Sequence, residues 1–190
     1  RKLPPQRNFF MAAGLEQVLS YLEAFQFADA DIAWLDQTGG FRPASLNALR
    51  AMRFTGEVHA MPEGSLFFPH EPILRITAPL PQAQLVETRV MNLLNFQTMV
   101  ASKACRSVLV AGDKPLIDFG LRRAHGAEAG LLAARAAYLA GLAGTSNVSA
   151  GARFGIPIYG TMAHSFVQAH LDEGEAFIHI AEAQPRNVVL

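Results

Sequence analysis

Two adjacent arginines, Arg122 and Arg123, lie where a short apolar segment gives way to a helical pattern. The segment 115–117 is typical of a strand, and the Ala- and Leu-rich stretch 127–143 is typical of a helix. In α/β folds, the turn between a strand and the next helix lies at the carboxyl end of the sheet, where ligands bind. Two guanidinium groups near helical N–H groups form a site suited to a carboxylate or a phosphate. The alternative is that both arginines are solvated loop charges.

Two later turns carry further polar side chains that could do chemistry. Ser146 lies in the turn 144–148 after the predicted helix, and His164 lies in the turn 160–166 after the apolar segment 156–159. A neutral imidazole is a competent nucleophile toward phosphate. The alternatives are that the residues around Ser146 cap the next helix and that His164 is a histidine in a capped helix. Asp118 could orient an arginine or cap the helix 127–143.

In their order and spacing, these stretches resemble the nicotinate phosphoribosyltransferase family. The resemblance comprises the Leu-Arg-Arg-Ala-x-Gly turn at 121–126, Ser-Asn-Val at 146–148, Gly-Ile-Pro at 155–157 and Gly-Thr-x-Ala-His at 160–164. The upstream stretches 13–16 and 61–64 also fit, so the resemblance covers nearly all 190 residues.

The resemblance implies a reaction of nicotinate with phosphoribosyl pyrophosphate that forms nicotinate mononucleotide and pyrophosphate, a step of NAD biosynthesis by salvage. It also implies ATP as a co-substrate, hydrolysed through a phosphorylated histidine, and Mg²⁺ bound with phosphoribosyl pyrophosphate. A homodimer is expected, with each site shared between subunits. The family's later phosphate-binding loops and its amino-terminal tyrosine segment are expected beyond Leu190 and before Arg1, so the chain is interpreted as a fragment.

By the same resemblance, Arg122 binds the carboxylate of nicotinate, since its planar fork matches a carboxylate bidentately. Phe119 lies against the pyridine face, or else is an ordinary core phenylalanine. Arg123 either contacts a phosphate group or lies at the protein surface without a ligand.

Ser146 is interpreted as the residue that distinguishes nicotinate from nicotinamide. Related nicotinamide-using enzymes have an aspartate there, which would repel a carboxylate ligand. Thr161 is placed near nicotinate, and His164 is the histidine that is phosphorylated. No protein metal ligands are predicted, and His125 receives no role.

The elements that must position these residues fall into two regions. Residues 1–110 are predicted to form a domain of helices and a small antiparallel sheet with a helical bridge. Residues 111–190 alternate strands and helices, which predicts a parallel sheet or barrel. The expected class is therefore α/β, with the first half of an irregular β/α barrel, as the resemblance also implies. The predicted helices are 11–27, one from Asp29, one from Pro43, 81–111 with a break near 92–97, 127–143, 147–154, 165–171 and 173–183. The predicted strands lie within 55–78, at 116–119, just before and up to Gly144, at 156–160 and at 187–190.

Composition excludes several classes of protein. Half of the residues, 51%, are apolar and 17% are charged, with sixteen basic and sixteen acidic side chains. A net charge of zero gives no field that would gather nucleic acid. The single cysteine, Cys105, permits no internal disulfide, which fits the cytoplasm. No targeting or membrane-spanning segment is evident, so no membrane partner is expected.

Other functions remain open. A sister enzyme using nicotinamide is disfavoured by Ser146, and one using quinolinate would need a second basic cluster that is not evident. A non-catalytic scaffold or regulatory subunit of the same fold would lack the phosphate loops. A Schiff-base lyase is disfavoured, because none of the lysines lies at the carboxyl end of a predicted strand: Lys2, Lys103 and Lys114.

Overall fold

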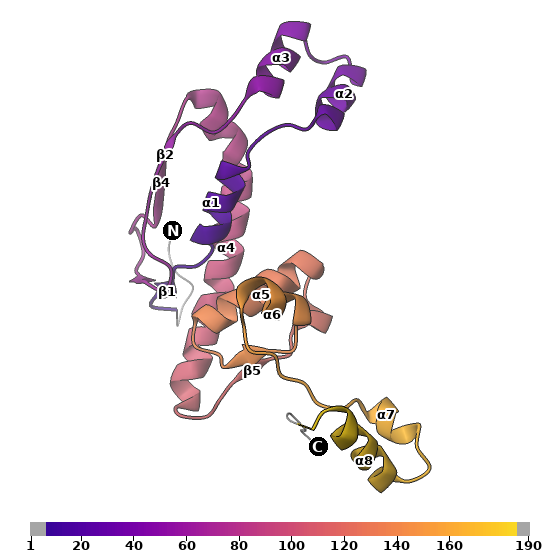
Figure 1. Cartoon of the computed structure of the whole chain (residues 1–190). Coiled ribbons are helices and arrows are strands. Elements are labelled where there is room, and N and C mark those ends of the chain that lie inside the picture. The colour runs from indigo at the N-terminus through magenta and orange to yellow at the C-terminus, as the bar shows by residue number, and fades with distance from the viewer. Residues whose placement is uncertain (1–6, 186–190) are drawn as a thin grey trace.

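The structure is a computed structural model that describes residues 7–185. It is organised along one long helix, α4 (Leu80–Ala111), against which the N-terminal elements and the helix α5 (Ala127–Leu139) pack (Figure 1). The predicted break near 92–97 is wrong, because α4 is continuous over 32 residues. Asn92 and Asn95 face solvent, where an asparagine costs a helix less than about 0.7 kcal/mol. Burial of a large apolar side chain contributes about 1.5–3 kcal/mol, so the apolar face of α4 outweighs both asparagines.

Helix α1 (Leu15–Glu23) packs alongside α4 and supplies Val18 and Leu22 to a shared core. It ends earlier than the predicted residue 27. Its start requires Gly14, which has φ of 103° and lies so close to α4 that a Cβ atom would be 2.8 Å from the Leu93 carbonyl oxygen. The remaining buried members of this core come from α4, α5 and the segment after α1: Phe25, Val86, Val90, Leu93, Leu94 and Leu132.

The antiparallel pairing predicted between residues 55 and 78 is present, but it is split between two small sheets. Strand β2 (Glu57–Ala60) pairs with β4 (Leu74–Thr77), with Val58 opposite Ile76. Strand β3 (Leu66–Phe67), which lies between them in the sequence, pairs instead with the N-terminal β1 (Phe10–Met11). This pairing holds the N-terminal strand β1 against β3.

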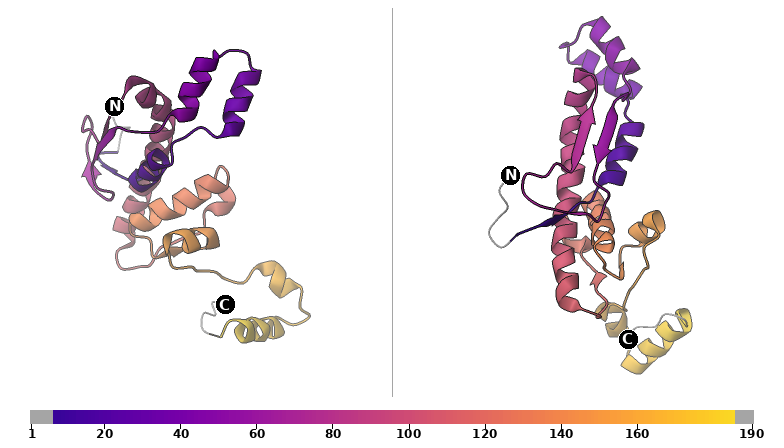
Figure 2. Two further views of the ribbon diagram at one scale, coloured as in Figure 1. Left: turned by 45° about the horizontal axis from the view of Figure 1, so that its top comes forward. Right: turned by 90° about the vertical axis from the view of Figure 1, so that its left-hand side faces the viewer.

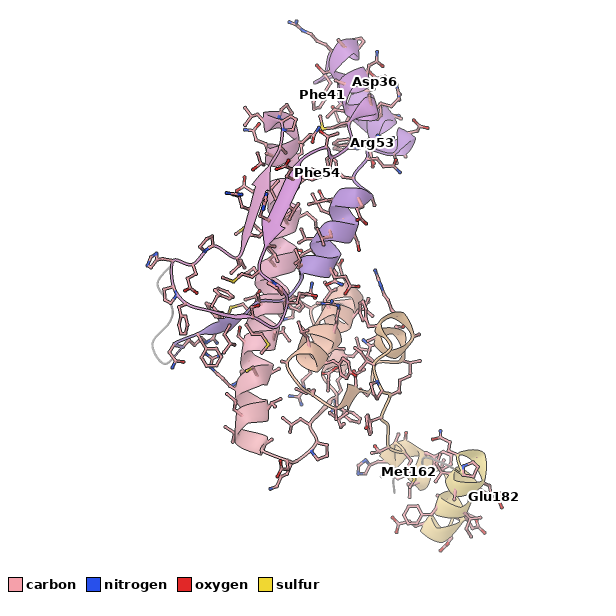
Figure 3. All side chains as sticks on the ribbon, turned by 60° about the vertical axis from the view of Figure 1, so that its left-hand side comes forward. Asp36, Phe41, Arg53, Phe54, Met162 and Glu182 are labelled. Atoms are coloured by element: carbon pink, nitrogen blue, oxygen red, sulfur yellow. The ribbon has the colours of Figure 1, made fainter. Side chains whose placement is uncertain are left out.

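Helices α2 (Asp29–Gln37) and α3 (Pro43–Ala51) pack against each other beyond one end of α4. Figure 3 labels Asp36 in α2, Phe41 in the loop between the two helices and Phe54 between α3 and β2. Both helices were predicted, and α3 begins with its proline, whose fixed φ suits the first turn.

Beyond α4 the chain alternates strands and helices, as predicted. Strand β5 (Ile117–Asp118) is followed by the 3₁₀ turn η1 (Leu121–Arg123) and by α5, and β6 (Gly144–Thr145) is followed by α6 (Val148–Phe154). Strands β5 and β6 are parallel. The predicted strand 156–160 is reduced to a single parallel bridge between Thr145 and Ile158. Helix α5 also ends earlier than the predicted residue 143.

The short helices α7 (His164–Gln168) and α8 (Glu173–Ala183) pack against each other and lie at the end of an extended linker (Figure 2). Met162, labelled in Figure 3, lies on this linker just before α7. The predicted strand 187–190 falls outside the described residues. No helix of the described part of the chain is long and apolar enough to cross a membrane.

The accessible surface of this arrangement is large for its mass. It measures 12727 Å², whereas a compact monomer of 20.6 kDa exposes about 8,900 Å². Large apolar side chains are among the exposed residues, as at Leu109 and Val110, which are 70% and 89% exposed near the end of α4. Such faces are usually covered in a native assembly.

Candidate functional site

The three turns predicted to carry the site follow three neighbouring parallel strand segments. The Ser146 N–H donates to the Asp118 carbonyl oxygen (2.8 Å), and the Tyr159 N–H donates to the Thr145 carbonyl oxygen (2.9 Å). These bonds bring the chain after Asp118, the chain at Ser146 and the chain after Tyr159 to one edge. Carboxyl ends of parallel strands form the ligand-binding edge of α/β sheets.

The arginine turn sits directly on α5. Gly130 of that helix contacts the turn so closely that a Cβ atom there would lie 2.3 Å from Leu121 Cδ1. Arg122 and Arg123 are both exposed, and neither guanidinium makes an ion pair or hydrogen bond with any of residues 7–185. Phe119 is 47% exposed, so it is not an ordinary core phenylalanine in this arrangement. The turn therefore presents two cations and an aromatic face to solvent.

Asp118 takes neither of its two predicted roles. Its carboxylate accepts hydrogen bonds from the Gly120 N–H (2.9 Å) and from the Thr145 hydroxyl (2.8 Å), which joins the first two turns. The prediction that residues around Ser146 cap the next helix is confirmed for Asn147, whose Oδ1 accepts from the Ala150 N–H at the start of α6 (3.2 Å). Ser146 is half-buried between these groups and takes no part in the cap.

Thr161 and His164 lie farther along the chain, and both are exposed. His164 is the first residue of α7, which packs mainly against α8. Within residues 7–185 no hydrogen bond ties His164 to the strand edge. His170 is engaged elsewhere, because its Nδ1 lies 2.8 Å from the Phe166 carbonyl oxygen and its Nε2 lies 2.9 Å from His179 Nδ1.

An ion-pair network that sequence reasoning missed connects α5 with α1. The Glu63 carboxylate accepts two hydrogen bonds from Arg135 (2.9 and 2.7 Å) and two from the N–H groups of Gly14 and Leu15 (2.6 and 3.1 Å). Arg135 also pairs with Glu16. The available signal was the lone basic residue in an otherwise Ala- and Leu-rich helix, since such a side chain needs a partner when its helix is buried.

The charges of this network shift one another's pKa values. Burial alone would raise the pKa of Glu63, but the hydrogen bonds from Arg135 and the Gly14 N–H, together with the charge of Arg135, lower it below its ordinary value. Burial alone would lower the pKa of Arg135, but Glu63 and Glu16 raise it. Both groups are therefore ionised at neutral pH.

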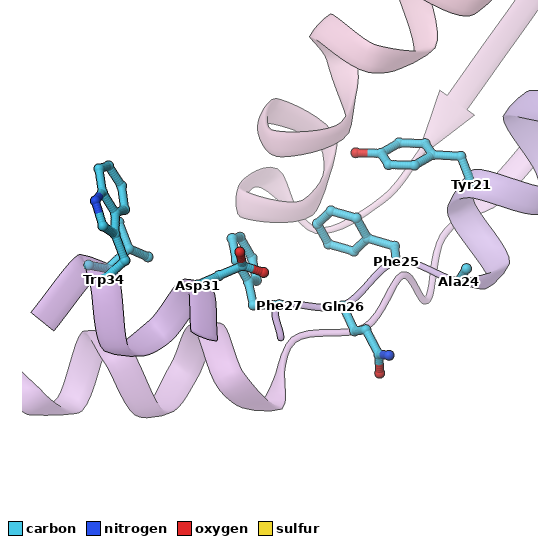
Figure 4. Close-up of a pocket in the computed structure, with 8 residues that line it drawn as sticks. Tyr21, Ala24, Phe25, Gln26, Phe27, Asp31 and Trp34 are labelled. Carbon is cyan, nitrogen blue, oxygen red and sulfur yellow. The ribbon is translucent and has the colours of Figure 1, made fainter. Parts of the chain in front are cut away.

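Two pockets lie among the helices, and their linings do not include Arg122, Ser146 or Thr161. One, of about 390 Å³, opens between α1 and α2 and is shown in Figure 4. Trp34, which lines this pocket, is 64% exposed. A second pocket of about 380 Å³ lies beside Arg135 and Glu16. The aromatic lining of the first pocket is Tyr21, Phe25, Phe27 and Trp34.

Comparison with known proteins identifies the family. The nicotinate phosphoribosyltransferase (NAPRTase) N-terminal domain matches residues 1–95, which is half of the chain, and the NAPRTase family matches residues 115–184. The chain belongs to the nicotinate phosphoribosyltransferase family.

The similarity to individual family members extends over most of the chain. A nicotinate phosphoribosyltransferase of Mycobacterium tuberculosis is 50% identical over 190 residues, which is 100% of this chain and 41% of the relative. The crystal structure of human nicotinic acid phosphoribosyltransferase is 42% identical with a TM-score of 0.81, over 89% of this chain and 35% of that one. A nicotinate-nucleotide pyrophosphorylase from Pyrococcus furiosus is 27% identical with a TM-score of 0.74, over 95% and 39% of the two chains. The chain thus spans about two-fifths of the length of these relatives.

Proposed function

We propose that this protein transfers the phosphoribosyl group of phosphoribosyl pyrophosphate to nicotinate, with coupled hydrolysis of ATP, as a step of NAD salvage. The proposal rests on one observation, namely that the three parallel strand segments end at the same edge. The turns with Phe119, Ser146 and Thr161 follow adjacent parallel segments there. The 50% identity with a named nicotinate phosphoribosyltransferase supports the same conclusion.

In this proposal, Arg122 holds the nicotinate carboxylate through two parallel hydrogen bonds, which its free and exposed guanidinium can supply. Phe119 lies against the pyridine ring, and its residue is 47% exposed, so it is accessible to a ligand. Ser146 presents a neutral hydroxyl where an acidic side chain would repel the ligand. Arg123 binds a phosphate of the second substrate.

Thr161 and His164 are assigned to the third turn of the same site. Thr161 contributes a hydroxyl near nicotinate, and His164 accepts the γ-phosphoryl group of ATP. A phosphorylated histidine would add close to two negative charges beside the turns that carry the arginines. That charge can reorganise the site and couple ATP hydrolysis to binding of phosphoribosyl pyrophosphate.

Mg²⁺ is assigned to the pyrophosphate substrate and not to ligands of this chain. Among residues 7–185 no group of three or more His, Cys, Asp or Glu side chains that could hold a metal ion occurs, and Mg²⁺ commonly binds through the phosphates of a substrate. No step of the proposal passes through the ion.

The architecture proposed for the whole protein extends the observed elements. Residues 1–110 would form one domain with α4 as a helical bridge, and residues 111–190 would form the opening βα units of an irregular barrel. A homodimer with sites shared between subunits would cover part of the exposed apolar surface.

Two alternative activities use related substrates. Transfer to quinolinate would require a second basic cluster beside Arg122 and Arg123, because quinolinate carries two carboxylates. Transfer to nicotinamide would require an acceptor for the amide N–H₂ group, which Ser146 supplies less well than an aspartate.

The test is a comparison of substrates with the native protein. Nicotinate, nicotinamide and quinolinate are each incubated with phosphoribosyl pyrophosphate, Mg²⁺ and ATP, and the mononucleotides are separated by chromatography. We expect product from nicotinate alone. Faster conversion of either other substrate would refute the proposal.

Two variants extend this test to the carboxylate. Ser146→Asp should weaken nicotinate binding about tenfold or more, since a like charge at about 4 Å costs roughly 1–4 kcal/mol. Ser149→Asp is the matched control, because Ser149 is exposed on the neighbouring helix α6. Equal effects of the two variants would contradict the assignment of Ser146.

A further inference from the structure

A chain of hydrogen bonds joins the two turns that carry Phe119 and Ser146. The Asn147 N–H donates to the Thr145 hydroxyl (3.0 Å), the Thr145 hydroxyl donates to Asp118 Oδ2 (2.8 Å), and the Gly120 N–H donates to Asp118 Oδ1 (2.9 Å). Thr145 is completely buried, and Asn147 is 5% exposed.

The direction of each bond follows from the groups involved. A carboxylate only accepts, so the single proton of the Thr145 hydroxyl points to Asp118, and the oxygen of that hydroxyl accepts from the Asn147 N–H. Both capacities of the hydroxyl are therefore used. A buried chain of this kind depends on every member, because an unpaired polar group in a low dielectric is costly.

The strands define the spacing between the turns through few backbone bonds. β5 and β6 are two residues long, and the third segment contributes one bridge. The side chain of Asp118 adds a second constraint to the backbone bond between Ser146 and Asp118, because it accepts hydrogen bonds from Gly120 in the first turn and from Thr145 beside the second. The fit at the first turn is tight, since a Cβ atom on Gly120 would lie 2.9 Å from Asp118 Oδ1.

We propose that Asp118 and Thr145 are positioning residues that hold Ser146 at a set distance from the Phe119–Arg122 turn. They thereby determine affinity for the pyridine acid and its discrimination from the amide without touching either ligand. The inference rests on the proposed function. A misplacement of about 1 Å in such a site can cost up to a hundredfold in rate, so a small change in spacing is measurable.

A structural role alone would have a different signature. If the chain served only to order the start of α6, its loss would lower stability and change all kinetic constants together. Asn147→Ala isolates that role, because it removes the side-chain cap of α6 while its backbone N–H still donates to Thr145.

The decisive variant is Thr145→Val, which keeps the shape of the side chain and removes the hydroxyl. In the native protein we expect its KM and calorimetric Kd for nicotinate to rise roughly tenfold or more, while the KM for phosphoribosyl pyrophosphate changes less than about twofold. The preference for nicotinate over nicotinamide should fall with it. Thr145→Ser restores the hydroxyl and should return nicotinate affinity to within about threefold of the original. Asn147→Ala should lower Tm and leave nicotinate affinity unchanged.

The outcomes separate this inference from the proposed function. If the unaltered protein converts nicotinate but Thr145→Val keeps its nicotinate affinity, or weakens both substrates equally, the positioning role is wrong and the proposed function stands. If Thr145→Ser fails to recover affinity, the hydroxyl is not the operative group and the inference is again wrong. If the unaltered protein neither binds nor converts nicotinate, the proposed function is refuted and the inference falls with it.

Discussion

The Glu63–Arg135 pair allows a quantitative prediction about stability. Glu63→Gln preserves the volume of the side chain and one acceptor oxygen, but it removes the charge and the second acceptor. The wild-type carboxylate accepts four hydrogen bonds, two of them from Arg135. The side chains of Glu63 and Arg135 are only 16% and 11% exposed, so solvent replaces little of what is lost.

The magnitude follows from these contacts. Removing one partner of a buried ion pair costs about 3–5 kcal/mol, because the remaining charge is left uncompensated. Here Arg135 keeps a second partner in Glu16, whose side chain is 60% exposed, which lessens the loss. The charge of Glu63 also lies at the N-terminus of α1, where an anion contributes about 0.3–1 kcal/mol. We therefore expect Glu63→Gln to lower the free energy of unfolding by about 2–4 kcal/mol.

The assay is urea unfolding of the native protein, followed by circular dichroism. Glu128→Gln is the matched control, because Glu128 pairs with Arg89 at a site where the two side chains are 60% and 38% exposed. An exposed pair contributes about 1 kcal/mol or less. If the two variants lose the same stability to within about 0.5 kcal/mol, the reasoning from burial is refuted.

The same variant has a defined pH dependence. Hydrogen bonds and the charge of Arg135 hold the pKa of folded Glu63 below its ordinary value of 4.5 despite its burial. A depressed pKa contributes stability that is fully present above the unfolded pKa and is lost as the pH falls through the folded pKa. The gap between wild type and Glu63→Gln should therefore be constant near neutral pH and shrink below about pH 4.5. A gap that persists in acid would contradict the assigned charge.

Further predictions concern the site and the exposed surface. Arg122→Ala should weaken nicotinate binding by about 2–5 kcal/mol in calorimetry, with Arg122→Lys recovering only part, and unchanged affinity would exclude the carboxylate role. His164→Ala should abolish nicotinate-dependent ATP hydrolysis while slow ATP-independent transfer survives, and transfer of labelled γ-phosphate to a different residue of the native protein would overturn this. Residues 1–190 expressed alone should aggregate, because apolar side chains such as Leu109 and Val110 are uncovered, whereas a soluble monomer with a cooperative melt would be inconsistent with this.

Local patterns were sufficient to predict the elements near the site. An apolar run, a polar turn and an Ala-rich periodic stretch predict a strand, a turn and a helix from neighbouring residues alone, and β5, η1 and α5 are found in that order. The ordered motifs at 121–126, 146–148 and 160–164 also identified the family that the comparisons then showed. These features depend on residues close in the sequence, which is why they could be predicted.

Only the tertiary structure decided which distant groups meet. Asn92 and Asn95 were expected to interrupt α4, but their side chains face solvent, and the direction of a side chain depends on what packs against its helix. β3 pairs with the N-terminal β1 and not with its neighbours, because strand pairing depends on which edge the packed helices leave free. Glu63 and Arg135 are 72 residues apart, so no local pattern relates them. Asp118 likewise meets Thr145 only because β5 and β6 lie side by side, and that contact joins the two turns of the proposed site.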